Sequence, residues 1–344
     1  MPQTLLKYLT APNARLIVHS PPPHSYTQHD DWDPVENIGI WDDFEYNHLI
    51  KRFHTSLTRE TDLSSTVTTA EDAGANIICD EAGLTILLGS TNINMVSRAL
   101  PEPLFIAAGS RITAYPHARP DWGAGDNNLQ YSSPEGVCRA LVCGDTKLEW
   151  DVERAMRLVA AGNYLDQRDA NIVRPFEQVQ HYCKVYKTRY GFILTNKVFV
   201  AVRARLSPSP QGPTSRLSRQ RAVKSHNRVL SDTSTGTNVS EISDSFSTMS
   251  FRPEPRDADV AMLEVVITPW DHGNSKNTIN LHLYCLVRLA AEERALSDHY
   301  EPIFGEQQKV AEKRKEPPGD LGQSSTSRKD STREQGTSER HRRP

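Results

Sequence analysis

The chain has 344 residues, a formal net charge of −3 and 37% hydrophobic residues. Counting its 18 Gly in place of its 11 Tyr gives about 39% apolar residues, below the roughly 45–50% of soluble domains. No apolar run approaches the roughly 18 residues of a membrane span, residues 1–9 lack the apolar core of a secretory signal, and five scattered cysteines match neither a disulfide framework nor a zinc site. We therefore expect an intracellular protein, in the nucleus or the cytoplasm, without a membrane partner.

Secondary-structure patterns alternate along the chain. Helical periodicity predicts helices over 41–57, 80–100, 151–164, 176–189 and 278–296, with a loop over 58–69 and the fourth helix starting after Pro175. Short apolar runs predict strands over 104–108, 111–115, 139–150, 192–195, 198–202 and 260–268. This order predicts an α/β fold with a mixed sheet rather than strict βαβ alternation.

Two stretches explain the low apolar content. Residues 207–257 contain 17 Ser or Thr, and residues 305–344 contain ten Lys or Arg and seven Asp or Glu. Neither composition buries enough apolar surface to offset the entropy of ordering, so we predict a disordered basic Ser/Thr-rich insert and a disordered charged tail. The rest divides into a polar N-terminal lead (1–34), a core (35–206) and a C-terminal strand and helix (258–304) that complete the domain.

The insert region is locally basic. Seven Lys or Arg and no acidic residue occur between positions 203 and 230. A solvated linker, a contact with a phosphate backbone and a nuclear-import patch all fit this pattern.

Asp145 and Lys147 are the strongest candidates for chemistry. Residues two apart on a strand point to one face, so these two side chains converge while Thr146 points away. Charged groups on a largely apolar strand need a partner or a metal ion, because burying them alone is costly. Asp121 on a neighbouring strand would complete an oxygen site suited to Mg²⁺, with Lys147 beside it to hold or deprotonate a water.

Gln178 and Tyr182 are four residues apart on a predicted helix and hence share a face. That face could cover the site and orient its carboxylates or a water molecule, as groups around a metal centre do.

These motifs together resemble a known superfamily. Pro120-Asp121 followed by Asp145-x-Lys147 after an apolar strand resembles the PD-(D/E)xK, or restriction-endonuclease-like, nucleases. Gly144-Asp145-Thr146-Lys147 before Gln178-xxx-Tyr182 is similar to the RecB-type exonuclease branch. More narrowly, the chain resembles a fungal family of PD-(D/E)xK nuclease-like proteins, through Arg119-Pro120-Asp121-Trp122, Gly191-Phe192-Ile193-Leu194-Thr195-Asn196 and Pro269-Trp270. The resemblance covers about residues 40–300 without the insert.

The resemblance implies a restriction-endonuclease-like open mixed sheet flanked by helices, and divalent-metal-dependent hydrolysis of nucleic acid, DNA being favoured over RNA. It implies that Asp121, Asp145 and the Thr146 carbonyl bind Mg²⁺ or Mn²⁺. Lys147 would position the attacking water and stabilise charge on the phosphate, with Gln178 and Tyr182 in support. Many members add a glutamate from the preceding helix, for which Glu71 and Glu81 both remain open.

Structural readings of the same residues compete with this interpretation. Asp145 and Lys147 could form an exposed ion pair worth under about 1 kcal/mol. Asp121 could be a turn residue, and Tyr182 alone fits a core position better than an active site. The main alternative function is a catalytically silent nuclease-like module that binds nucleic acid or a protein partner, because a fold does not prove an activity.

Overall fold

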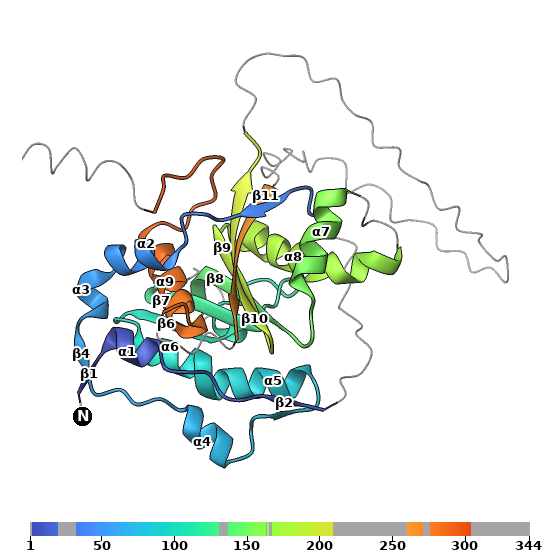
Figure 1. Ribbon diagram of the computed structural model, residues 1–344. Coiled ribbons are helices and arrows are strands. Elements are labelled where there is room, and N and C mark those ends of the chain that lie inside the picture. Colours follow the sequence, from blue (N-terminus) through green and yellow to red (C-terminus); the bar gives the residue numbers. More distant parts are fainter. Residues whose placement is uncertain are drawn as a thin grey trace, which may run out of the picture. The chain divides into compact units, whose positions relative to one another are not determined.

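A seven-stranded mixed sheet forms the centre of the computed structural model (Figure 1). Its strands lie in the order β3 (Ile38–Ile40), β11 (Val260–Pro269), β10 (Val198–Leu206), β9 (Tyr190–Thr195), β8 (Cys138–Lys147), β7 (Trp122–Gln130) and β6 (Leu104–Ala108). Neighbours are antiparallel except for the pairs β3–β11 and β8–β9. The predicted α/β class with an open mixed sheet is confirmed.

The structure describes residues 2–19, 32–130, 137–162, 164, 167–208, 260–270 and 276–303. All of them belong to one compact unit that ends at residue 304. The predicted disorder of 207–257 and 305–344 lies outside the described residues, apart from Ser207 and Pro208.

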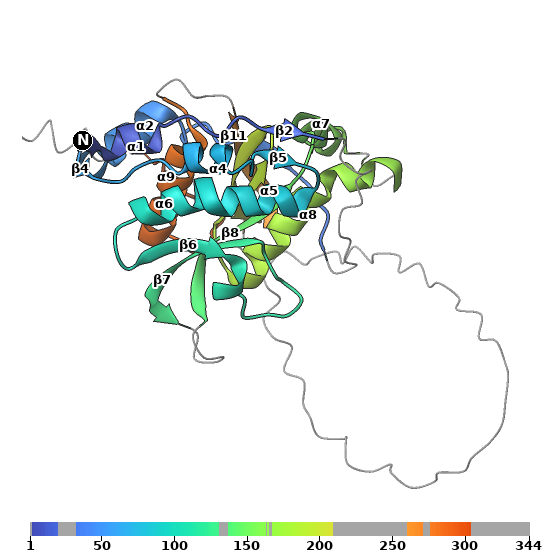
Figure 2. The same ribbon diagram turned by 90° about the horizontal axis from the view of Figure 1, so that it is seen from below.

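Helices cover both faces of the sheet. One face is covered by α7 (Val152–Ala161) and α8 (Gln167–Tyr186), and the other by α1 (Leu5–Leu9), α5 (Glu81–Leu88), α6 (Asn94–Ala99) and α9 (Ile279–Glu292). Figure 2 shows α5 and α6 crossing the β6–β8 side. Because side chains alternate along a strand, Ile193 of β9 joins the α8 core while Phe192 and Leu194 join the α9 core.

Shorter elements complete the described fold. They are α2 (Tyr46–Arg52), α3 (His54–Leu57), α4 (Val67–Asp72), the two-stranded pairs β1 (Gln3–Thr4) with β4 (Glu60–Thr61) and β2 (Ile17–Val18) with β5 (Ile77–Ile78), the π-helical turn η1 (Gly89–Ile93) and the 3₁₀ turn η2 (Gly109–Arg111). The segment before residue 35 is more than a polar lead, because Leu5, Tyr8 and Leu9 of α1 are buried in the core. No helix among the described residues has the length and apolarity that crossing a bilayer requires.

The predicted strand over 111–115 is wrong, and the true strand β7 begins at Trp122. Its glycines weaken the sequence signal for a strand, but the packing requires them. A Cβ on Gly123 would lie 2.3 Å from Ile112, and one on Gly125 would lie 2.8 Å from Phe105. The segment predicted as a strand therefore packs against β7 instead of joining the sheet.

Several predicted helices differ from the structure in their bounds or continuity. The helix over 41–57 is a turn followed by α2 and α3, and the predicted loop over 58–69 contains β4 and the start of α4. The helix expected after Pro175 already starts at Gln167 with Pro175 inside it. Burial of Val173 and Phe176 on either side of the proline outweighs the local cost of a missing backbone donor. The helix over 80–100 forms as α5, η1 and α6 in succession, and the Asp80 side chain caps its start by accepting from Gly83 N at 2.7 Å.

Candidate functional site

The end of β8 brings together the residues predicted to bind metal. Trp122 pairs with Gly144 in the antiparallel ladder, so the next position along places Asp121 beside Asp145. The Asp121 Oδ2 atom accepts a hydrogen bond of 2.9 Å from the backbone N–H of Thr146, which fixes this carboxylate against the strand. Opposite residues of an antiparallel pair point to the same face. Both carboxylates therefore lie on the face of the sheet that carries α8.

Lys147 lies among the acidic groups. Its ammonium forms an ion pair with Asp145 Oδ2, lies 3.8 Å from Glu81 Oε1 and donates to the Thr146 carbonyl at 3.0 Å. Asp145 is 1% exposed and Lys147 is 5% exposed. The pair is therefore buried, and the reading of Asp145 and Lys147 as an exposed surface ion pair is excluded.

Burial also changes the ionisation of the site. Burial raises the pKa of Asp145 from 3.8 to about 7, because loss of water disfavours the charged form more strongly than the Lys147 ammonium favours it. The negative charges of Asp121 and Glu81 raise this pKa further. Burial acts to lower the pKa of Lys147, but the charges of Asp145 and Glu81 outweigh it and leave that pKa above its ordinary value. Near neutral pH the carboxyl of Asp145 can thus exchange a proton while Lys147 stays charged.

Helix α8 supports Asp145 as predicted. The Gln178 amide nitrogen donates to Asp145 Oδ1 at 3.1 Å and to the Tyr182 hydroxyl at 2.7 Å, so both of its hydrogens have acceptors. The Tyr182 hydroxyl in turn donates to the Arg119 carbonyl at 3.0 Å. Burial, with a smaller contribution from the Asp145 charge, raises the pKa of Tyr182 and keeps its proton in place. Gln178 and Tyr182 therefore connect the end of β8 to the segment that carries Asp121.

Thr146 points to the opposite face, as predicted from the strand pattern. Its hydroxyl accepts a hydrogen bond of 2.8 Å from the Trp122 indole. Trp122 is a positioning residue that the site prediction did not include, although it directly follows Asp121 in the sequence. The contact fixes the two strands together where they carry Asp121 and Asp145.

Of the two glutamates left open by the sequence, Glu81 lies at the end of β8 and Glu71 lies elsewhere. Glu81 starts α5, and its carboxylate contacts Lys147 and accepts from the Leu148 N–H at 3.4 Å. Glu71 instead accepts from the Arg15 N–H at 2.8 Å, near the β2–β5 pair. The Glu81 side chain is 46% exposed, so the acidic cluster is open to solvent on this side.

The chemistry of these groups fits a hard divalent cation. Asp121, Asp145, the Thr146 carbonyl and Glu81 offer oxygen atoms, the ligands that Mg²⁺ and Mn²⁺ prefer. The buried Asp145 Oδ2 atom faces the Lys147 ammonium, which compensates its charge. Among the described residues, however, no three His, Cys, Asp or Glu side chains are already arranged around a cation position. The Lys147 ammonium contacts Asp145 and the Thr146 carbonyl and would compete with a cation for these oxygen atoms.

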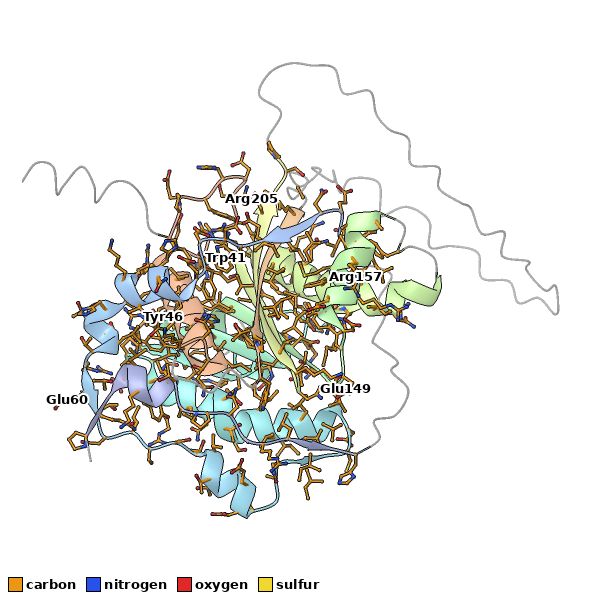
Figure 3. The ribbon with its side chains drawn as sticks, viewed as in Figure 1. Trp41, Tyr46, Glu60, Glu149, Arg157 and Arg205 are labelled. Atoms are coloured by element: carbon orange, nitrogen blue, oxygen red, sulfur yellow. The ribbon has the colours of Figure 1, made fainter. Side chains whose placement is uncertain are left out.

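Acidic and amide groups continue past the end of β8. Glu149, labelled in Figure 3, has a positive φ of 58° and pairs with Lys197 at 2.5 Å. Its backbone N–H donates to the Asn196 side chain at 2.8 Å. These contacts close the turn after Lys147 and hold the end of β8 next to the β9–β10 turn.

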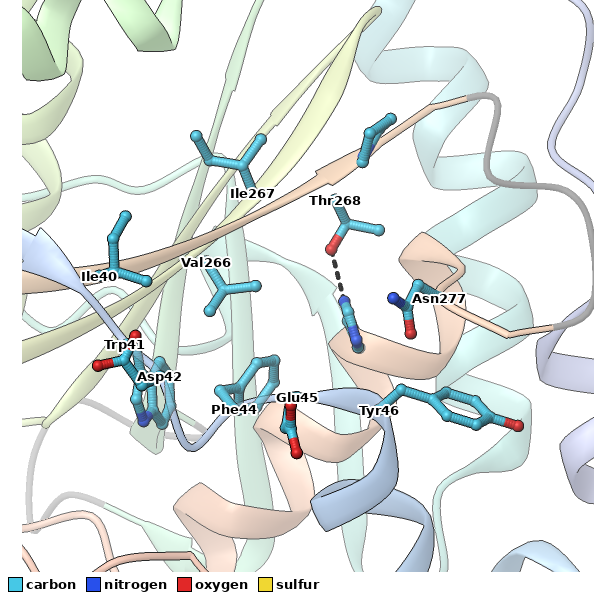
Figure 4. Close-up of a pocket in the computed structure, with 12 residues that line it drawn as sticks. Ile40, Trp41, Asp42, Phe44, Glu45, Tyr46, Val266, Ile267, Thr268 and Asn277 are labelled. Carbon is cyan, nitrogen blue, oxygen red and sulfur yellow. Dashed lines mark hydrogen bonds between the residues drawn. The ribbon is translucent and has the colours of Figure 1, made fainter.

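A separate cavity of ≈ 260 Å³ lies at the other edge of the sheet, between the β3–α2 turn, the end of β11 and the start of α9 (Figure 4). Its wall includes the hydrogen-bonded pair Thr268 and His282, both buried. Asp42 and Glu45 also line it. The cavity contains none of the residues predicted for catalysis.

In comparisons with known proteins, no family model, no curated protein and no solved structure matches the chain.

Proposed function

We propose that the protein hydrolyses nucleic-acid phosphodiester bonds with the help of Mg²⁺ or Mn²⁺, with DNA as the favoured substrate, in the nucleus or the cytoplasm. The observation that carries this proposal is the buried pair of Asp145 and Lys147, with Asp121 on the adjoining strand and Gln178 bonded to Asp145. A buried ion pair contributes little to stability compared with apolar residues of the same size. We therefore attribute the arrangement to chemistry rather than to folding.

Each residue has a defined role in this proposal. Asp121, Asp145 and the Thr146 carbonyl hold the cation, with Glu81 at the open side. A divalent ion bound there supplies Lewis-acid polarisation of the scissile phosphate and lowers the pKa of a bound water. Lys147 holds the attacking water and places positive charge where the phosphate gains negative charge. Gln178 orients the Asp145 carboxylate, and Tyr182 fixes Gln178.

A non-catalytic module is the second candidate, and one observation favours it. Lys147 already neutralises Asp145, and both side chains are almost fully buried. In that case the site is a structural remnant of a nuclease-like fold that binds nucleic acid or a protein partner, and it takes up no metal ion.

Two substitutions separate the candidates. Asp145→Asn is expected to abolish both Mn²⁺ binding and cleavage, because a neutral amide lacks the charge that attracts a hard cation. Lys147→Met is expected to abolish cleavage while Mn²⁺ binds no more weakly, because its apolar stem still packs and the competing ammonium is gone. Calorimetry with Mn²⁺ and cleavage of single- and double-stranded DNA and RNA measure the two properties.

Glu153→Gln serves as the control, since Glu153 forms an exposed ion pair with Arg157 on α7 and takes no part in the site. If the wild-type protein binds no divalent ion and cleaves none of the four substrates, the nuclease proposal fails and the non-catalytic module takes its place.

A further inference from the structure

A row of four aromatic and imidazole rings lies beside the site just described. Trp32 lies 6.3 Å from His181, His181 lies 6.1 Å from His117, and His117 lies 6.0 Å from Tyr115, measured between ring centroids. We call these four residues the ring row. They come from three separate segments: the one before β3, helix α8, and the connection between η2 and β7. His117 is exposed, Tyr115 is 39% exposed, and the other two are half-buried.

The fold fixes the ring row to the residues of the site. His181 directly precedes Tyr182 on α8, and the hydroxyls of Tyr182 and Tyr186 donate to the carbonyls of Arg119 and Ala118. Those two carbonyls lie two and three residues before Asp121. The segment that displays Tyr115 and His117 is therefore held on α8 by the same contacts that position Asp121.

The far end of the row is anchored as well. The Asp33 carboxylate pairs with Lys184 at 2.7 Å, and the Asp33 carbonyl accepts from Gln180 at 3.0 Å. Trp32, the residue before Asp33, is therefore held against α8 next to this ion pair.

We propose that the ring row is a stacking platform for the unpaired bases of a single-stranded nucleic acid whose backbone passes the Asp145 site. This inference rests on the proposed function. Planar rings stack with any base, whereas the bases of a duplex already stack on each other and are closed to such contacts. The exposed Arg119 between the row and Asp121 carries a guanidinium suited to a phosphate of the same strand. The occupant is therefore a single strand rather than a duplex.

The test is a binding measurement without divalent ions, so that no cleavage takes place. Fluorescein-labelled dT20, rU20 and a 20-base-pair DNA duplex are titrated with the wild-type chain and with the double variant Tyr115→Ala/His117→Ala. Loss of stacking is expected to weaken dT20 binding at least about tenfold. Binding of the duplex is expected to change less than about twofold. Comparison of dT20 with rU20 identifies the preferred single strand.

Further variants separate stacking from charge and from folding. Tyr115→Phe/His117→Phe keeps two planar rings and is expected to restore binding. Arg119→Gln is expected to reduce the slope of log K against log salt by about 0.7, as loss of one phosphate contact on a single strand does, whereas the alanine variant keeps the slope. The control Tyr46→Ala/His54→Ala removes the same residue types from α2 and α3, on the other side of the sheet, and is expected to bind as wild type does.

The outcomes distinguish this inference from the proposed function. Unchanged dT20 binding by the alanine variant, equal losses for single strand and duplex, or no binding of dT20 and rU20 by the wild type would each overturn the stacking platform. Cleavage by the wild type in Mg²⁺ or Mn²⁺ would then still support the nuclease. Conversely, ring-dependent binding without any cleavage would keep the platform and reject the nuclease.

Discussion

The buried carboxyl of Asp145 makes the stability of the protein depend on pH in a way that the variant Asp145→Asn should remove. The pKa of Asp145 is about 7 in the folded chain and near its ordinary 3.8 in the unfolded chain. A pKa difference of roughly 3 between the two states corresponds to about 4 kcal/mol in the free energy of unfolding. The folded state holds the proton more tightly, so this contribution to stability is fully present below pH 3.8 and is lost as the pH rises through 7.

We therefore expect the free energy of unfolding of the wild type to fall relative to that of Asp145→Asn by about 4 kcal/mol between pH 4 and pH 8. Lys147 does not oppose this trend: its raised pKa gives a contribution that is lost only at alkaline pH. In Asp145→Asn the Asp145 charge that raises the pKa of Lys147 is gone, so burial would lower that pKa. The stability of the variant would then rise with pH, which increases the difference between the two proteins in the same direction.

Urea denaturation of both proteins across this pH range, in the presence of a chelator, measures the difference. Asp145→Asn also loses the ion pair with Lys147, which changes its free energy of unfolding at every pH. The informative quantity is therefore how the difference in free energy of unfolding between the two proteins varies with pH. Asp33→Asn, at an exposed ion pair, is expected to follow the wild type within about 1 kcal/mol. A difference between wild type and Asp145→Asn that stays constant within about 1 kcal/mol would refute the buried, proton-exchanging state of Asp145.

Two further predictions address the geometry around the site. Glu81→Gln is expected to weaken Mn²⁺ binding roughly 10- to 100-fold in calorimetry, while Glu71→Gln, away from the site, leaves it unchanged; equal effects would contradict the choice of Glu81. Gly109→Ala is expected to destabilise the fold by about 1–3 kcal/mol in thermal unfolding, because its Cβ would lie 1.9 Å from the Pro120 backbone oxygen just before Asp121; an unchanged transition would show that this contact relaxes freely.

Local spacing made part of the site predictable. Asp145 and Lys147 share a face because strands have a period of two, and Gln178 and Tyr182 share a face because helices have a period near four. Both relations depend only on the correct secondary structure, and both occur in the structure. The apolar strand β8 and the long helix α8 gave strong enough patterns for that assignment.

Relations between distant segments were not predictable in the same way. β7 was missed because Gly123 and Gly125 give no strand signal, and their role becomes visible only when Ile112 and Phe105 fill the space beside them. The choice between Glu71 and Glu81 depended on where α5 begins relative to the end of β8, which lies 66 residues later in the chain. The contact of Trp122 with Thr146 also requires the register of two strands, which the sequence pattern does not provide.

The two candidate functions differ in the role they give to Lys147. Its ammonium lies among Asp145, Glu81 and the Thr146 carbonyl, the oxygen-bearing groups to which the proposed function assigns a divalent cation. If the pair is only structural, Lys147→Met leaves a buried carboxylate without compensation and should cost about 3–5 kcal/mol that added Mn²⁺ cannot restore. If the site binds metal, the cation replaces the lost charge and stabilises the folded state by mass action. The metal-binding role predicts that Mn²⁺ restores the stability of Lys147→Met but not that of Asp145→Asn. A purely structural ion pair predicts that Mn²⁺ restores neither variant.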